Sequence, residues 1–231
     1  MDKIQYLSQF NLLHSLSIED LIEMDKLTSI TTFPKSTFIQ TPDTFHEGLY
    51  FVKKGMVRLY RLNAEGKQFT SDILNEGNVF GEMAKISFGT RDHYIETIEA
   101  SDICLLDKPR FDDFLINHPR FMMALLGVLS ERIASMSLLS QYLALGNLHD
   151  KILFALVKLS NQFGVINEGS YCKIGVSLTH QEIAHFTGAT REAVTVALQE
   201  LVKEEAIKTG FKTVWIHKDK LLDIQRNQVQ L

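Results

Sequence analysis

Hydrophobic and polar residues alternate with different periods along the chain, and each period marks a region. Between Thr31 and about Leu106, short runs of apolar and β-branched residues are broken by glycine-containing turns. From Pro119 to Leu145, apolar residues recur every three or four positions, as in a long helix. Beyond Asn147 the pattern is that of shorter helices with brief strands. The sequence therefore predicts an α+β chain in which an antiparallel β region precedes a long helix.

Closely spaced glycines divide the first region into brief segments of strand character: Gly48, Gly55, Gly66, Gly77, Gly81 and Gly89. Short strands separated by such turns are typical of antiparallel barrels and jelly rolls. Before them, apolar residues at helical intervals predict one or two short helices around Ser15 to Asp20, and Phe111 to Leu115 predicts another. We assign residues 1–117 to an N-terminal domain built on this β-roll.

The predicted long helix carries a heptad seam, with residues spaced alternately by four and three. Its members are Met122, Leu126, Leu129, Ile133, Met136, Ser140 and Leu143. A seam that is apolar at all positions but Ser140 favours a partner helix in a coiled coil. The alternative is a helix that lies on its own β-roll. We interpret residues 118–146 as a dimerisation helix, with a hinge at Gly146 and Asn147, where Asn147 can cap the next helix.

Two further helices that meet across a tight turn are predicted between Leu178 and Glu205. Thr179 and Glu182 have the spacing of a capping box, which begins a helix. Gly188 tolerates the positive φ that ends a helix, and Thr190 can cap the next one. The second helix has one apolar face, formed by Val194, Leu198, Leu201 and Val202. This pattern is typical of a helix-turn-helix, although an ordinary helical hairpin has the same periodicity.

The segment QEIAHFTGATREAV resembles the recognition segment of the Crp/Fnr family of bacterial transcription regulators, in which TxxEIAxxxGxxRExV spans both helices. The residues Ala206–Lys208, Gly210 and Thr213–His217 are similar to the β-wing of that family. LYFVKKGMVRLYRLNAEGKQ is similar to the central hairpin of its effector domain. The resemblance covers nearly the whole chain. It implies a cyclic-nucleotide-binding-type β-roll, and a winged helix-turn-helix over residues 147–231.

The resemblance also implies partners. A member of this family acts as a cytoplasmic homodimer that binds double-stranded DNA at an inverted repeat, here with TGTGA-like half-sites, and works with RNA polymerase. No run of eighteen apolar residues and no N-terminal signal pattern occurs, so we expect no membrane association. The effector state would change the relative pose of the two DNA-binding domains.

Arg191 and Glu192 are the residues that the resemblance assigns to reading a G·C pair. Arginine can donate two hydrogen bonds to guanine O6 and N7, and glutamate can accept one from cytosine N4. The alternative is that both are solvated at a helix start, where the helix dipole favours Glu192. Some members place a second basic residue where this chain has Val196, so this chain lacks that second basic group for a base contact. Candidates for contacts with phosphates are Thr190, Thr195, Thr179 and His180.

The formal net charge of −4 is divided unevenly along the chain. From residue 147 onward, ten Lys and Arg face nine Asp and Glu, which gives +1, whereas residues 1–146 hold fourteen against nineteen, which gives −5. This asymmetry is weak. We therefore expect DNA binding to depend on a local basic patch, formed by Arg191, Lys208, Lys212 and Lys218.

The nucleotide cassette of the family is altered in this chain. In the family, a Gly-Glu pair holds the ribose hydroxyl and an Arg-Ser pair holds the cyclic phosphate. Gly81 and Glu82 match the first pair, but Arg91 falls one residue early and Asp92 stands in place of serine. Two unit charges about 4 Å apart repel by roughly 1–4 kcal/mol, so we expect no cyclic nucleotide. A pocket for another small effector, or a structural pair, would comprise Gly81, Glu82, Arg91 and Ser137, the last following Met136 in the long helix.

The sequence gives little support to catalysis or to a metal or haem cofactor. Cys104 and Cys172 cannot supply an iron–sulfur cluster, and we expect both thiols to be inert. A haem ligand such as His93 or His46 is disfavoured, because lone histidines usually serve as hydrogen-bonding residues. Phosphate-loop and serine-hydrolase motifs are absent from the sequence. We expect no enzyme. The rival hypothesis is a small-molecule-binding jelly-roll protein or enzyme whose helical tail serves assembly only.

Overall fold

A computed structural model of the protein describes residues 16–83, 86–106, 114–220 and 222. The chain divides into two compact units, Met1–Ile133 and Ala134–Leu231. The division falls inside the long helix, so the predicted domains 1–117, 118–146 and 147–231 remain a prediction. Most of the helix expected at Phe111–Leu115 lies outside the described residues. The helix expected near Ser15–Asp20 is α2 (Ile18–Leu27), which begins with Ser17 and Asp20 in a capping box.

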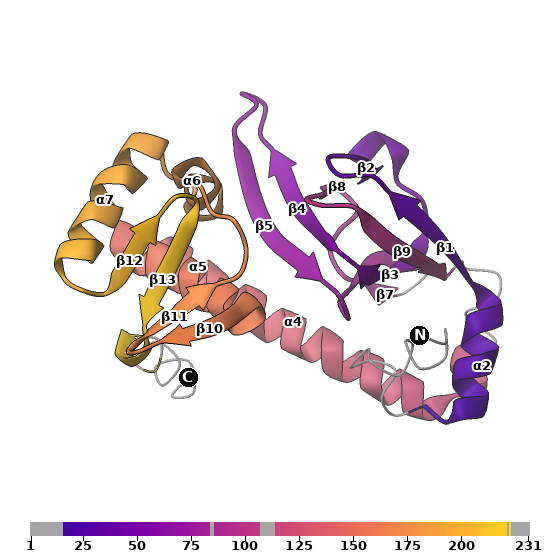
Figure 1. Cartoon of the computed structure of the whole chain (residues 1–231). Helices are drawn as coiled ribbons and strands as arrows, with labels where there is room; N and C mark the ends of the chain where they lie inside the picture. The colour runs from indigo at the N-terminus through magenta and orange to yellow at the C-terminus, as the bar shows by residue number, and fades with distance from the viewer. Residues whose placement is uncertain (1–15, 84–85, 107–113, 221, 223–231) are drawn as a thin grey trace. The chain divides into compact units, whose positions relative to one another are not determined.

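The first unit is the expected antiparallel β-roll, built from two sheets (Figure 1). One sheet has the order β1 (Thr28–Phe33), β9 (Ser101–Leu106), β3 (Gly48–Lys54), β6 (Val79–Met83) and β7 (Ile86–Ser87). The other has the order β2 (Phe38–Gln40), β8 (Tyr94–Thr97), β4 (Met56–Leu62) and β5 (Gln68–Asn75), and a short 3-10 helix, η2 (Pro42–Thr44), follows β2. Every paired strand runs antiparallel to its neighbour.

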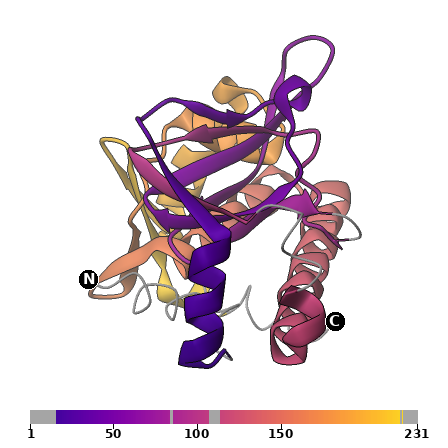
Figure 2. The same ribbon diagram turned by 90° about the vertical axis from the view of Figure 1, so that its right-hand side faces the viewer.

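Two apolar clusters hold the roll together. The first contains Val52, Leu59 and Ile95 from three strands, and Tyr50 stacks on Phe80 with ring centroids 5.0 Å apart. The second joins α2 and the beginning of α4 (Pro119–Leu145) to the roll. Its buried members include Leu21, Met24, Phe51, Phe114, Phe121 and Leu125. Figure 2 shows α2 and the first turns of α4 at the same end of the strands.

Helix α4 spans the residues that the heptad pattern predicted. Among the described residues it is the one helix that, by length and composition alone, could cross a membrane. Arg132 lies near its middle and pairs with Asp72 of β5, with 2.6 Å between the guanidinium nitrogen and the carboxylate oxygen. This side of the helix therefore lies against the roll.

The second unit combines the end of α4 with a helix-turn-helix and a four-stranded sheet. Asn147 caps α5 (Leu148–Phe163) as expected, with Asp150 completing a capping box. The sheet has the order β10 (Gly164–Glu168), β11 (Tyr171–Ile174), β13 (Thr213–His217) and β12 (Ile207–Gly210). The residue pattern of the sequence did not predict β10. Pairing with β11, which itself pairs with β13, makes this segment a strand.

We expect Gly81→Ala to lower the free energy of unfolding by about 2–4 kcal/mol. Gly81 has φ +109°, and a Cβ atom there would overlap the carbonyl oxygen of Gly48 on the paired strand. Gly66→Ala is the matched control, because Gly66 also has positive φ (+76°) but open space around it. It should cost only about 1 kcal/mol. Urea unfolding measures the free energy of unfolding of both variants. Equal decreases would mean that a Cβ atom between β6 and β3 does not destabilise the protein.

Candidate functional sites

The helix-turn-helix is formed by α6 (His180–Thr187) and α7 (Arg191–Lys203), with the predicted local interactions in place. The amide of Glu182 donates to the Thr179 hydroxyl at 3.2 Å, and the Glu182 carboxylate accepts from the Thr179 amide at 2.6 Å. Gly188 ends α6 at φ +68°, and the Thr190 hydroxyl accepts a hydrogen bond from the amide of Ala193. The two helices therefore meet across the expected turn.

The recognition face of α7 is defined by what the helix buries on its other side. Val194, Ala197, Leu198 and Leu201 are buried. Arg191 and Glu192 are exposed in the first turn, and Val196 is exposed one turn later. The arrangement leaves a guanidinium and a carboxylate available to base edges at the start of the helix, with an apolar side chain beside them.

The four threonine and histidine candidates differ in what they can still donate. The Thr195 hydroxyl donates to the Arg191 carbonyl at 2.8 Å and lies 2.8 Å from Nδ1 of His180. Since a hydroxyl has one proton, Nδ1 of His180 must donate to Thr195. Thr195 therefore positions His180 and has no proton left for a phosphate. Thr179 and Thr190 accept hydrogen bonds within their caps and donate none to the residues that the structure describes, so each keeps an O–H for a phosphate oxygen.

The predicted basic patch is divided in the structure. Lys208 places Nζ 3.9 Å from the centre of the Tyr171 ring, and Lys218 donates to the carbonyl of Gly169 at 2.8 Å. Both lysines are therefore engaged with the β10–β11 hairpin. Lys212 and Arg191 instead line one concavity of about 520 Å³, between the start of α7 and the β12–β13 wing. Only these two members of the expected patch come together there.

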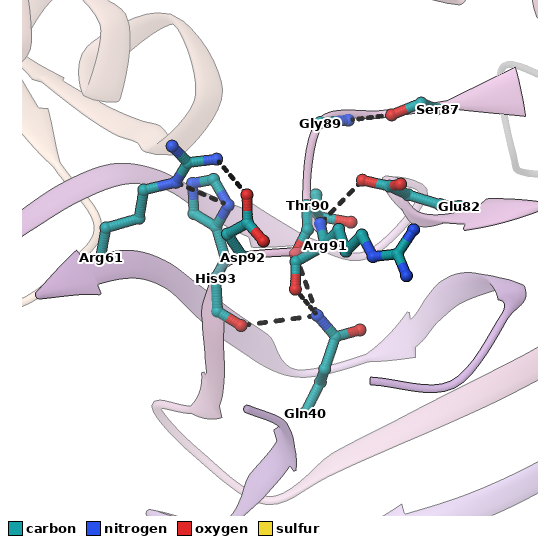
Figure 3. A network of polar contacts seen from close by, with 9 residues as sticks. All are labelled: Gln40, Arg61, Glu82, Ser87, Gly89, Thr90, Arg91, Asp92 and His93. Atoms are coloured by element: carbon teal, nitrogen blue, oxygen red, sulfur yellow. Dashed lines mark hydrogen bonds and ion pairs between the residues drawn. The ribbon is translucent and has the colours of Figure 1, made fainter. Parts of the chain in front are cut away.

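In the β-roll, Glu82 and Arg91 meet through the backbone (Figure 3). The Glu82 carboxylate accepts a hydrogen bond from the amide of Arg91 at 2.7 Å, and the Arg91 guanidinium lies over the Phe45 ring, 4.9 Å from its centre. The amide of Gly81 donates to the Thr90 hydroxyl at 3.0 Å. The predicted pair thus holds its own loop, so the Glu82 carboxylate already has a partner from the chain.

Asp92 makes a contact that the sequence did not suggest. Its carboxylate lies 3.6 Å from a guanidinium nitrogen of Arg61 on β4, and both side chains are largely exposed. An exposed pair of this kind contributes little to stability. It does set a negative charge next to Arg91, on the side of Arg61 in Figure 3. The fourth predicted residue, Ser137, lies in the second unit, where it lines a groove of α4 and α5 with Lys158.

Gln40 is a residue of this loop that sequence reasoning missed. It is 1% exposed, and its Nε2 donates to the carbonyl of Thr90 at 2.9 Å and lies within 3.4 Å of the carbonyls of Arg91 and His93. Figure 3 shows the amide reaching this backbone from below. No local pattern predicts it, because fifty residues separate Gln40 from Thr90. The buried amide fixes the path of the loop that carries Arg91 and Asp92.

His93 is buried beside the same loop and 6% exposed. Its Nδ1 accepts a hydrogen bond from Nε of Arg61 at 3.4 Å. Burial, together with the positive charges of Arg61 and Arg132, lowers the pKa of His93 from 6.5 to about 4. The imidazole is therefore neutral near pH 7 and serves as an acceptor inside the roll. Among the described residues, no cluster of three His, Cys, Asp or Glu side chains could hold a metal ion.

Two family models match the chain, one in each unit. Residues 30–118 match the cyclic nucleotide-binding domain, and residues 151–224 match the Crp-like helix-turn-helix domain. The global nitrogen regulator of Nostoc sp. (strain PCC 7120) is 29% identical over 198 residues, which are 85% of this chain and 88% of that protein. The cyclic AMP receptor protein of Thermus thermophilus is 26% identical over 218 residues, 92% of this chain and 94% of its own.

Solved structures show the same fold. A CooA mutant from Carboxydothermus hydrogenoformans superposes with a TM-score of 0.75 at 24% identity, and covers 98% of this chain and 99% of its own. FixK2 from Bradyrhizobium japonicum gives a TM-score of 0.72 at 17% identity, with coverage of 85% and 96%. The β-roll, long helix and winged helix-turn-helix expected from the sequence are confirmed.

We expect the stability of the roll to fall as the pH drops from about 6.5 to about 4. Because the pKa of His93 is lowered in the folded state, the unfolded chain binds more protons in this window, and acid favours unfolding. His93→Gln keeps a neutral acceptor and should reduce the loss of unfolding free energy between pH 7 and pH 5 by about 2 kcal/mol. Urea titrations at both pH values measure this, and an unchanged loss would refute it.

Proposed function

Because the chain belongs to the Crp/Fnr family of transcription regulators, we propose that it binds an inverted-repeat DNA site as a homodimer. The observation that carries this proposal is the start of α7, where Arg191 and Glu192 are exposed together behind a capped turn. Two such helices related by a two-fold axis would enter successive major grooves about 34 Å apart. Each would read a G·C pair within a TGTGA-like half-site.

The proposed dimer interface is the heptad seam of α4. Met122, Leu126, Ile133 and Met136 are exposed in the single chain, Ile133 by 69%. Leu129 is partly buried against the core of the roll, and Leu143 is also partly covered. The helix thus lies on its own roll along one side, as the alternative interpretation required, and leaves most of the seam for a second α4. Burial of each such side chain contributes about 1.5–3 kcal/mol.

The β-roll would set the DNA-binding activity without cyclic AMP. In support, the Glu82 carboxylate already accepts from the Arg91 amide, and the Asp92 carboxylate lies where a phosphate-binding serine is expected. The effector would be another small molecule, or none. The proposed hinge is Gly146 and Asn147, the two residues that separate α4 from α5.

The proposed setting is the cytoplasm, with RNA polymerase as a further partner and no membrane association. Each of the relatives named above is a regulator or receptor protein by its own name. They are not enzymes, which argues against the rival jelly-roll enzyme. That rival also predicts no salt-dependent affinity for DNA, whereas contacts with phosphates weaken steeply between low and moderate salt.

Selection of bound sequences from a random DNA pool tests the proposal directly. The purified protein should recover an inverted repeat without additives, and cyclic AMP should not change the result. An inverted repeat recovered only with cyclic AMP would overturn our interpretation of Asp92. Arg191→Ala should lose about 1–3 kcal/mol on the recovered site and discriminate less at one base pair. Lys203→Ala, at the far end of α7, is the control and should bind as the wild type does.

Ile133→Glu should shift the protein from dimer to monomer, because two carboxylates would face each other in the middle of the seam. Sedimentation velocity over a range of concentrations measures the change, which we expect to weaken dimerisation at least tenfold. Leu145→Glu is the matched control, since Leu145 is 81% exposed on the same helix but outside the seam. Equal dimerisation of the Ile133→Glu variant and the wild type would place the interface elsewhere.

A further inference from the structure

Phe211 at the tip of the wing is an apolar side chain held in solvent. It is 91% exposed, the most exposed of the large hydrophobic residues that the structure describes. It forms a two-residue turn with Lys212 between the paired residues Gly210 and Thr213. An aromatic ring in this position contributes nothing to the core of its own unit. Its role is therefore to be sought in a contact with another molecule.

The tip is held firmly by its neighbours. Lys212 has φ +53°, and its carbonyl accepts a hydrogen bond from the amide of Leu178 at 3.0 Å, just before α6 begins. The Thr213 hydroxyl donates to the Phe211 carbonyl at 3.0 Å. Nζ of Lys212 lies 5.6 Å from the centre of the Phe211 ring. The ring and its neighbouring ammonium group are therefore presented together at a fixed distance from the helix-turn-helix.

The concavity between the wing and the start of α7 is lined by groups that can bind a phosphate. Lys212 supplies positive charge, Thr179 supplies a hydroxyl proton that its cap leaves free, and Arg191 lines the edge next to the recognition face. The described residues that line it include no aspartate or glutamate. A surface with cations, hydroxyls and an amide but no acidic group is complementary to a nucleic-acid backbone.

We propose that one DNA strand passes through this concavity and that Phe211 enters the minor groove beside the half-site. The inference rests on the proposed function, since it needs α7 in the major groove. The backbone that separates the two grooves would then lie between α7 and the wing, against Lys212 and Thr179, while Arg191 reads the base pair. Phe211 would reach past it to pack on deoxyribose and base edges, as apolar wedges do in minor grooves.

This placement predicts a sequence preference outside the half-site. In the minor groove a G·C pair presents the guanine 2-amino group, whereas A·T pairs do not, so an apolar ring is better accommodated by A·T. Inosine lacks that amino group. An I·C pair therefore resembles A·T in the minor groove and G·C in the major groove, and it distinguishes the groove that is read.

The test compares duplexes that carry the selected site with A·T, G·C or I·C pairs in the flanks, by fluorescence anisotropy. Wild-type protein should bind the A·T and I·C flanks alike and the G·C flank less tightly. Phe211→Ser should lose about tenfold or more on the A·T flank, as loss of a buried aromatic contact implies, and should bind all three flanks alike. Val165→Ser, which changes an exposed apolar residue of β10, is the control and should bind as the wild type does.

Salt dependence separates the ring from the charge beside it. Lys212→Asn, which keeps a residue tolerant of positive φ, should reduce the slope of log affinity against log salt by about one. Phe211→Ser should leave that slope unchanged. If Phe211→Ser binds the A·T flank as tightly as the wild type while Arg191→Ala is impaired, the wing inference fails and the proposed function stands. If neither the wild type nor Val165→Ser binds DNA, the proposed function fails with it.

Discussion

The structure depends on one helix that must cover apolar surface on two sides. Along one side of α4, Phe121 and Leu125 are buried in the core of the roll, and Arg132 pairs with Asp72. Along another side, the seam residues Met122, Leu126, Ile133 and Met136 remain exposed. A helix of this composition is poorly suited to a monomer, because exposed apolar patches of this kind mark sites of association. The contacts with the roll thus leave one face of α4 for the proposed partner helix.

Local patterns predicted the elements whose causes are local. Capping boxes and the seam of α4 rest on residues three or four positions apart, so the sequence shows both partners at once, and the positive φ at Gly188 follows from a single glycine. Contacts between distant residues could not be found in this way. The Arg132–Asp72 pair spans sixty residues and the Gln40–Thr90 hydrogen bond spans fifty. The sequence did not predict β10 for the same reason, since only its pairing with β11 defines this strand.

The predicted sites differ in how far the sequence could describe them. Arg191 and Glu192 could be placed because a helix start fixes where the side chains of its first turn emerge. Lysine side chains are long and flexible, so Lys208 and Lys218 could not be directed from their positions alone, and both turn toward the β10–β11 hairpin. In the roll, the replacement of serine by Asp92 was visible in the sequence. The support that Gln40 gives to the loop was not.

Hydrogen bonds link α6, α7 and the β12–β13 wing to one another. Thr195 joins the start of α7 to His180 of α6, and the Lys212 carbonyl joins the wing to Leu178 just before α6. Remodelling the recognition helix alone would break these bonds, whereas turning all three parts together keeps them. A signal that reached this unit would therefore move all three parts as one body. The two copies of the unit in a dimer would change their spacing while each keeps its internal shape.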